Sequence, residues 1–215
     1  MKPYYERDGI TIYLGDCREI LPTLPKVDLV LTDPPYGISL PTDYRSRGRS
    51  KMAACRDYAP VHDDDKPFDP SHLPRVPTVL FGGNYFSDRL PPSSGWLVWD
   101  KLRPDGLDQA DAELAWTNCV KGVRVFRHLW NGMMRASEQG TGHHPTQKPV
   151  ALMEWVLTRK GVPDGTVLDP YMGSGPVLIA AKNLHRRAIG IEIEERYCEI
   201  AAKRLDQGVL PLGGE

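Results

Sequence analysis

The element Asp33-Pro34-Pro35-Tyr36 has the residue types needed to hold an amino group beside a planar base, and it directly follows the apolar stretch 27–32. Two successive prolines fix the backbone, so the carbonyls of Asp33 and Pro34 keep one orientation. The Asp33 carboxylate and one such carbonyl provide two acceptors for the two hydrogens of an NH2 group. The ring of Tyr36 offers a flat face for stacking. The alternative interpretation is a proline turn with an exposed aromatic ring.

A second chemical element lies in residues 167–181, which have the pattern of a strand, a glycine turn at Gly173-Ser174-Gly175 and a helix. Such a turn lets the backbone approach a ligand closely, and the helix start favours an anionic group. Glu192 follows about twenty residues later, where an acid can bind ribose hydroxyls. The pattern indicates a nucleoside-containing cofactor. The alternative is a tight turn with a solvated Glu192, and the missing third glycine disfavours NAD without excluding it.

Strands and helices alternate in the C-terminal third, which predicts an α/β fold with a mostly parallel sheet covered by helices. Residues 37–75 are polar, rich in proline and arginine, and without a clear period, so we expect a mobile loop or insertion there. The expected strands cover 10–14, 27–32, 78–81, 96–99, 114–117, 123–126, 166–168 and 188–193, and the expected helices cover 150–160, 176–185 and 195–206.

Composition excludes several classes of protein. The chain has 215 residues, of which 40% are hydrophobic and 26% charged, as expected for one globular domain over 1–215. It has no apolar run long enough to cross a membrane, and its charged first residues predict that the protein is not secreted. The four cysteines are scattered, which argues against a disulfide framework and for the cytoplasm. No metal site is predicted, because residues 62–65 (HDDD) are expected to form a solvated acidic loop.

The net charge of −1 means that any nucleic acid must bind to a local basic patch. Two windows without acids provide candidates, and the second interleaves its cations with aromatic rings, which suits phosphate contact and base stacking. The alternative is a pair of solvated loops. The candidate DNA-binding residues are Arg45, Arg47, Arg49 and Lys51 in the first window, and Lys121, Arg124, Arg127, Trp130 and Arg135 in the second.

Taken together, the motifs at 33–36 and 169–175 resemble the amino-group DNA methyltransferases that use S-adenosylmethionine. The catalytic motif precedes the cofactor motif, which is similar to the β-class, a circularly permuted form of the Rossmann-like methyltransferase fold. The stretches 14–17, 99–101 and 144–149 also fit the family, and the resemblance spans about residues 9–207. It places a short target-recognition region at about 102–143.

The resemblance implies a role for each matching position. Asp33 and the Pro34 carbonyl would hold the target amine, Pro35 would complete the rigid motif, and Tyr36 would stack on the extruded base. The implied cofactor contacts are Asp16 by the adenine, Glu192 on the ribose, Asp169 and the turn from Gly173 to Gly175 at the methionine part, and Thr146 and Lys148 near its carboxylate, with Asp33 and Tyr171 in the same set. Pro176 replaces the family's usual threonine, and the loss of a hydroxyl and an N–H predicts weaker cofactor affinity.

The implied function is transfer of a methyl group from S-adenosylmethionine to the N6 amine of a flipped adenine in double-stranded DNA. Family members with Asp in the first catalytic position mostly modify adenine, and those with Ser mostly modify cytosine N4. The alternatives are an N4-cytosine enzyme, an enzyme acting on RNA or a protein glutamine, and an inactive nucleic-acid-binding partner. The resemblance also implies a bacterial or phage origin and is compatible with a homodimer.

Overall fold

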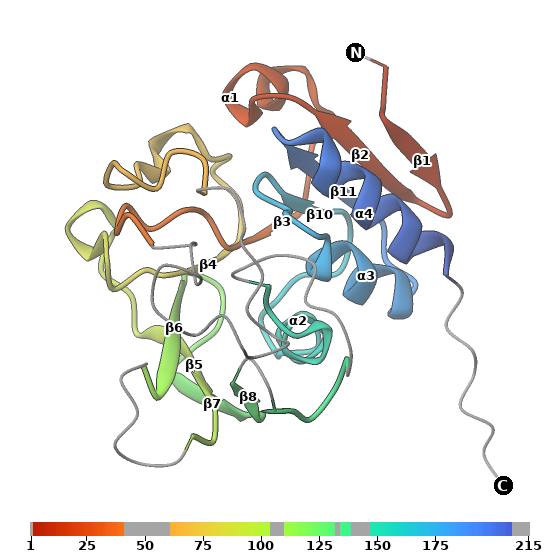
Figure 1. The fold of residues 1–215 in the computed structure, drawn as a ribbon. Helices are drawn as coiled ribbons and strands as arrows, with labels where there is room; N and C mark the ends of the chain where they lie inside the picture. The colour runs from red at the N-terminus through yellow and green to blue at the C-terminus, as the bar shows by residue number, and fades with distance from the viewer. Residues whose placement is uncertain (1, 41–60, 104–109, 132–133, 139–146, 208–215) are drawn as a thin grey trace, which may run out of the picture.

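The structure, a computed structural model, describes residues 2–40, 61–103, 110–131, 134–138 and 147–207. Its centre is a nine-stranded mixed sheet with the order β1-β2-β11-β10-β3-β4-β6-β5-β7 (Figure 1). The strands are β1 (Tyr5–Arg7), β2 (Ile10–Leu14), β3 (Leu29–Thr32), β4 (Thr78–Phe81), β5 (Gly95–Asp100), β6 (Ala112–Thr117), β7 (Val123–Arg127), β10 (Val167–Asp169) and β11 (Ala188–Glu192). A separate pair is formed by β8 (Trp130–Asn131) and β9 (Met134–Arg135).

Most of the sheet is parallel, as the alternating pattern predicted. The strands β2, β11, β10, β3 and β4 form consecutive parallel pairs, and β7 is parallel to β5. Antiparallel pairing is found between β1 and β2, between β4 and β6, and between β5 and β6. The predicted α/β fold with a mostly parallel sheet is confirmed, and the motif at 33–36 follows β3 whereas the motif at 169–175 follows β10.

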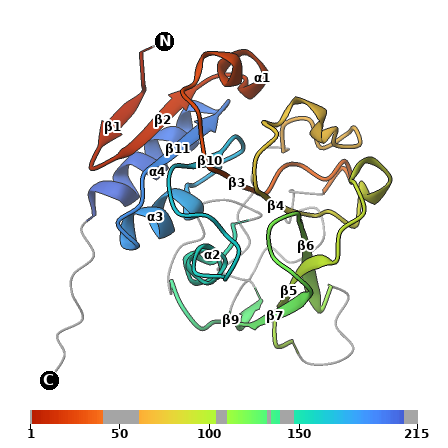
Figure 2. The ribbon, with the colours of Figure 1, turned by 180° about the vertical axis from the view of Figure 1, so that it is seen from behind.

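Helices cover both faces of the sheet. They are α1 (Cys17–Ile20), α2 (Val150–Leu157), α3 (Pro176–Asn183) and α4 (Glu195–Asp206). The larger core cluster joins α2, α3 and α4 to one face of the central strands, including Leu29 and Leu31 of β3. Val30 of the same strand faces the other way, into a smaller cluster with α1. This alternation explains why Leu29–Thr32 is fully buried and why its first three residues are all apolar. Figure 2 shows α3, α4 and α1 beside the β2–β10 part of the sheet, with β4–β7 at its other end.

The site is positioned by the neighbouring strands β3 and β10. They run parallel, with Val167 opposite Leu29 and Leu168 opposite Val30, so their carboxyl ends meet at one edge of the sheet. From β3 the sheet continues to β4 on one side, and from β10 it continues to β11 on the other. Ligands of open α/β sheets bind at such a point, where the strand order reverses.

Strand β1 and helix α1 are among the elements that were not predicted from the sequence, as are β8 and β9. The hairpin of β1 and β2 turns at Asp8 and Gly9, which both have positive φ (51° and 78°). An Asp-Gly pair is a strong hairpin signal, so strand β1 could have been predicted from the sequence. Helix α1 is only one turn long, and Asp16 caps it by accepting the Arg18 backbone N–H at 2.8 Å.

The expected insertion at 37–75 and the expected target-recognition region at 102–143 are only partly described. Within 37–75 the described residues contain one 3-10 helix, Pro70–His72, and Phe68 anchors this part in a cluster with Leu80 and Trp116. Residues 112–117 and 123–127 of the expected recognition region are β6 and β7 of the main sheet. The target-recognition assignment of the remainder stays a prediction. Among the described helices, none is both long and apolar enough to cross a membrane.

Candidate active site

A cavity of about 740 Å³ opens at the carboxyl ends of β3 and β10. Residues of both motifs line it, including Asp33 to Tyr36 on one side and Asp169 to Gly173 on the other. Asp16 and Glu192 line it as well, from the ends of β2 and β11. The fold therefore brings the predicted amine-binding and cofactor-binding residues into one space.

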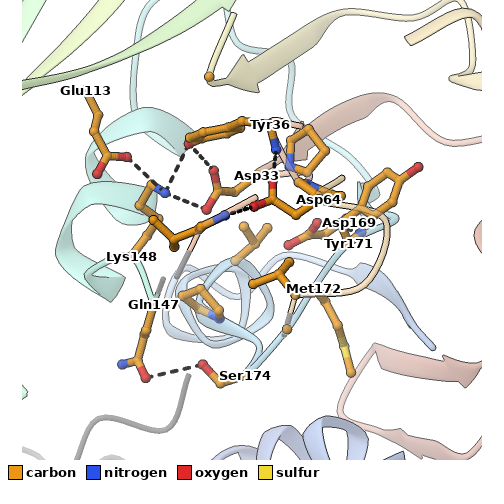
Figure 3. A pocket seen from close by; sticks show the side chains of 18 of the residues that line it. Asp33, Tyr36, Asp64, Glu113, Gln147, Lys148, Asp169, Tyr171, Met172 and Ser174 are labelled. Carbon is orange, nitrogen blue, oxygen red and sulfur yellow. Dashed lines mark hydrogen bonds and ion pairs between the residues drawn. The ribbon is translucent and has the colours of Figure 1, made fainter. Parts of the chain in front are cut away.

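Both oxygens of the Asp33 carboxylate accept a hydrogen bond from a neighbouring side chain (Figure 3). The Tyr36 hydroxyl donates to Oδ1 at 2.5 Å, and the Lys148 ammonium lies 2.5 Å from Oδ2. Burial raises the pKa of Asp33, and the Lys148 ammonium acts in the opposite direction. The side chain is 18% exposed, so it can still be reached from the cavity.

The ring of Tyr36 packs between residues of the loop that follows β4. It stacks on Tyr85, with ring centroids 5.0 Å apart and an interplanar angle of 17°. Gly82 packs against the ring so closely that a Cβ there would lie 2.1 Å from it, and its φ of +74° also favours glycine. Tyr85 is half exposed, so it is the neighbour of Tyr36 that can move when a base enters.

Asp64 organises the chain just after the catalytic motif. Its Oδ1 accepts the backbone N–H groups of Tyr36 at 3.0 Å and Gly37 at 2.9 Å, and its Oδ2 accepts that of Leu40 at 2.7 Å. The residue is only 6% exposed. The expectation of a solvated acidic loop is therefore wrong for Asp64. Within the described part of the chain, no three His, Cys, Asp or Glu side chains gather closely enough to hold a metal ion.

The glycine turn is hydrogen-bonded to the Glu192 carboxylate. The backbone N–H of Gly173 donates to Glu192 Oε2 at 2.9 Å, and that of Glu194 donates to Oε1 at 2.8 Å. Burial raises the pKa of Glu192, whereas these two bonds lower it. Gly175 adopts a left-handed conformation with φ +78°, and Pro176 then opens α3 at the position where a missing N–H costs little.

Asp169 lies at the end of β10 and is almost completely buried. Its Oδ1 accepts the Thr32 hydroxyl at 2.7 Å and the Tyr171 backbone N–H at 3.2 Å. Burial raises the pKa of Asp169 to about 7, although both hydrogen bonds act to lower it. A buried acid with such a pKa is ready to ionise against a cationic group that enters the cavity.

Sequence reasoning missed Glu113, which lies on β6 and reaches the same cavity. Its Oε2 is 3.0 Å from the Lys148 ammonium, and its Oε1 is 2.6 Å from that of Lys101. Burial alone would raise the pKa of Glu113, but the ammonium groups of Lys148 and Lys101 lower it to about 2. A single acid within the apolar stretch 112–116 was the available signal.

Lys148 points toward the catalytic motif, with its side chain only 5% exposed between Asp33 and Glu113. Its expected place near the cofactor carboxylate stays a prediction, and Thr146 lies outside the described residues. The neighbouring Gln147 accepts the Ser174 hydroxyl at 3.3 Å, which ties this segment to the glycine turn (Figure 3). Tyr171 contacts His72, with 2.9 Å between the hydroxyl and Nε2.

Some residues of the second basic window are exposed at the surface, and others line the cavity. Lys121, Arg124 and Arg127 are exposed, and Arg127 lies 3.4 Å from Asp100. Trp130 is buried and lines the cavity, and the Arg135 guanidinium lies 4.3 Å from the centre of its ring. The DNA contacts stay a prediction. The first window, with Arg45, Arg47, Arg49 and Lys51, lies outside the described residues.

The α/β fold places the residues predicted to bind a nucleoside-containing cofactor beside those predicted to hold an amino group. A family model described as DNA methylase (N6_N4_Mtase) matches residues 95–203, about half of the chain. The chain belongs to this family, the amino-group DNA methyltransferases.

Individual relatives agree with this placement. The chain is 27% identical to the type II methyltransferase M.ScaI of Streptomyces caespitosus, over 95% of this chain and 84% of the relative. It is 25% identical to M2.LlaDCHI of Lactococcus lactis subsp. cremoris, over 96% and 93%. The crystal structure of the M1.HpyAVI–SAM complex superposes with a TM-score of 0.58 at 29% identity, covering 91% of this chain and 99% of that one. The PvuII DNA methyltransferase, titled cytosine-N4-specific, shares the fold with a TM-score of 0.62 at 15% identity, covering 99% and 91%.

Proposed function

We propose that this protein is a site-specific DNA methyltransferase that transfers a methyl group to the N6 amine of a flipped adenine in double-stranded DNA. The observation that carries this proposal is the common cavity of Asp33, Pro34 and Tyr36 with the residues of the glycine turn. The relatives named as type II methyltransferases support a role in a modification system. A bacterial cytoplasm, where such DNA is found, is the proposed location.

The cofactor is S-adenosylmethionine, the ligand of the structural neighbour M1.HpyAVI. The residues fit this molecule, because a buried acid, a glycine turn and an acid at the end of the next strand all line one cavity. Asp169 would face the cationic amino group of the methionine part, and Glu192 would bind the ribose hydroxyls. When bound, the cofactor supplies an electrophilic methyl group on a sulfonium.

The chain's own residues would make the amine reactive by positioning. An amine inside a duplex is out of reach, so the nucleotide must leave the stack, and Tyr36 provides a face for its base. The amine nitrogen is a poor nucleophile, because its lone pair is delocalised into the ring. Two acceptors, the Asp33 carboxylate and the Pro34 carbonyl, would favour a pyramidal nitrogen with a directed lone pair. The Asp33 charge would stabilise the positive charge that develops on nitrogen.

Cofactor affinity is expected to depend on pH through Asp169. Its carboxyl has a pKa of about 7 in the free protein, and a cationic amino group binds the ionised form. Affinity should therefore rise about fivefold between pH 6 and pH 7, and the gain should end near pH 8, where an α-amino group itself loses its proton. Isothermal titration calorimetry of S-adenosylmethionine over this range measures the gain. The Asp169→Asn variant should bind more weakly and without this pH dependence; an unchanged slope in that variant would assign the titration to another group.

The proposal of adenine rests on Asp33. The fold alone does not identify the target base, because the PvuII enzyme, titled cytosine-N4-specific, has the same fold. The test is expression in a bacterial host that lacks its own DNA methylation, followed by single-molecule sequencing of the host DNA. We expect modified adenines, all within one short sequence. Modified cytosines at such a site would show that the target base is cytosine and not adenine. Unmodified DNA would contradict the proposed methyltransferase activity.

The proposed DNA surface includes the exposed cations Lys121, Arg124 and Arg127 next to the cavity-lining Trp130 and Arg135. Phosphate contacts make DNA affinity fall steeply with salt. A second copy of the chain would extend this surface, and light scattering with and without DNA tests the proposed homodimer.

A further inference from the structure

In this structure the target amine would have to compete for the Asp33 carboxylate, because each of its two oxygens already has a close partner. The Tyr36 hydroxyl and the Lys148 ammonium lie 2.5 Å from its two oxygens. Withdrawal of one of these partners would free an Asp33 oxygen to accept the amine at full strength. The following inference rests on the proposed function, because it concerns how the amine reaches Asp33.

We propose that Glu113 is a positioning residue that receives the Lys148 ammonium when the target amine binds to Asp33. The ammonium lies between the two carboxylates, 2.5 Å from Asp33 and 3.0 Å from Glu113. A small displacement would break its contact with Asp33 and shorten its contact with Glu113. Figure 3 shows Lys148 with its ammonium directed between these two acids.

Lys148 is the partner that can withdraw without losing ionic pairing. Its side chain is only 5% exposed, and a buried ammonium without a counter-charge is strongly unfavourable. Glu113 provides the counter-charge, because its carboxylate stays in contact with the ammonium when the ammonium leaves Asp33. Burial lowers the pKa of Lys148, but Asp33 and Glu113 raise it above its usual value, so the group stays charged in either position.

Glu113 is itself held in place from the opposite side. Its second oxygen is 2.6 Å from the Lys101 ammonium, and the β5–β6 register places Trp99 opposite Glu113 on the neighbouring strand. Glu113 thus keeps one oxygen for Lys101 and one for Lys148. With Lys148 moved to Glu113, the Asp33 carboxylate would keep the Tyr36 hydroxyl and face the amine without a competing cation. The positive charge that develops on nitrogen would then be its counter-charge.

The test compares Glu113→Gln and Glu113→Asp with the wild type in steady-state methylation of DNA at saturating S-adenosylmethionine. Gln keeps the size but loses the charge, and Asp keeps the charge but is shorter. We expect kcat/KM for DNA to fall about 100-fold in Glu113→Gln and less than tenfold in Glu113→Asp, because the charge is what receives Lys148. Glu154→Gln on α2, where the acid accepts the Asn183 amide, is the matched control and should keep wild-type turnover.

The double variant Glu113→Gln with Lys148→Gln separates positioning from packing. Without its charge, residue 148 no longer competes for Asp33, so the double variant should recover at least tenfold over Glu113→Gln alone. The inference is overturned if Glu113→Gln is as active as Glu113→Asp, or if the double variant shows no recovery. A wild-type protein that methylates no DNA would contradict the proposed function instead.

Discussion

Replacing Asp33 by alanine is expected to lower methyl transfer by about 1,000-fold or more while S-adenosylmethionine still binds. The carboxylate supplies one of the two acceptors for the amine and the only negative charge of the catalytic motif. Its loss leaves Lys148 paired with Glu113, so the site keeps a counter-charge for the ammonium. Single-turnover transfer of a labelled methyl group, beside cofactor titration, measures both quantities.

The Asp33→Asn variant refines this prediction. The amide keeps one acceptor oxygen of similar position and loses the charge, so its activity should lie between those of the wild type and the alanine variant. Transfer near the wild-type rate in Asp33→Ala would remove Asp33 from the mechanism. Loss of cofactor binding in both variants would instead give Asp33 a role in the cofactor site, which the family resemblance also implies.

The second large effect is expected from Asp64→Ala. Its carboxylate accepts the backbone N–H groups of Tyr36, Gly37 and Leu40, and the residue is buried. Without it these donors lose their partner, which should cost about 2–4 kcal/mol of unfolding free energy and leave Tyr36 poorly placed. We expect turnover to fall about 100-fold. Denaturant titration and steady-state kinetics measure the two effects.

Neighbouring positions supply the controls for Asp64. Asp64→Asn keeps one acceptor oxygen and should lose less of both stability and turnover than the alanine variant. Asp65→Ala removes an exposed acid of the same loop and should resemble the wild type. Equal effects of Asp64→Ala and Asp65→Ala would show that the loop contributes only its net charge.

The sequence was sufficient for the features that depend on neighbours along the chain. The apolar stretch before Asp33 forms the buried strand β3, and the glycine turn before Pro176 joins β10 to α3. The predicted helix over 150–160 ends earlier, because Thr158 already leaves the helical conformation with ψ near 5°. The Asp8-Gly9 pair carried a hairpin signal that also depends only on local backbone conformation.

What the sequence could not provide are contacts between distant segments. Lys148 and Asp33 are 115 positions apart, and Asp64 follows Tyr36 by 28 positions. Asp64 has no local pattern that distinguishes a buried partner from a solvated acid. Glu113 has only its place in an apolar stretch, which does not identify Lys148 as its partner. Trp130 also illustrates this limit, because its place among cations indicated a DNA contact, whereas the fold packs its ring into the core cluster. These residues acquire their roles only when the sheet brings their strands and loops together.

The central claim is that Asp33 and its neighbours direct a methyl group onto an adenine amine. The most direct measurement is mass spectrometry of nucleosides from unmethylated DNA, incubated with the purified protein and S-adenosylmethionine carrying a deuterated methyl group. The account predicts N6-methyladenine with the deuterium label, and none with Asp33→Ala. Labelled N4-methylcytosine would contradict the assigned base, and the absence of any labelled nucleoside despite bound cofactor would contradict DNA as the acceptor.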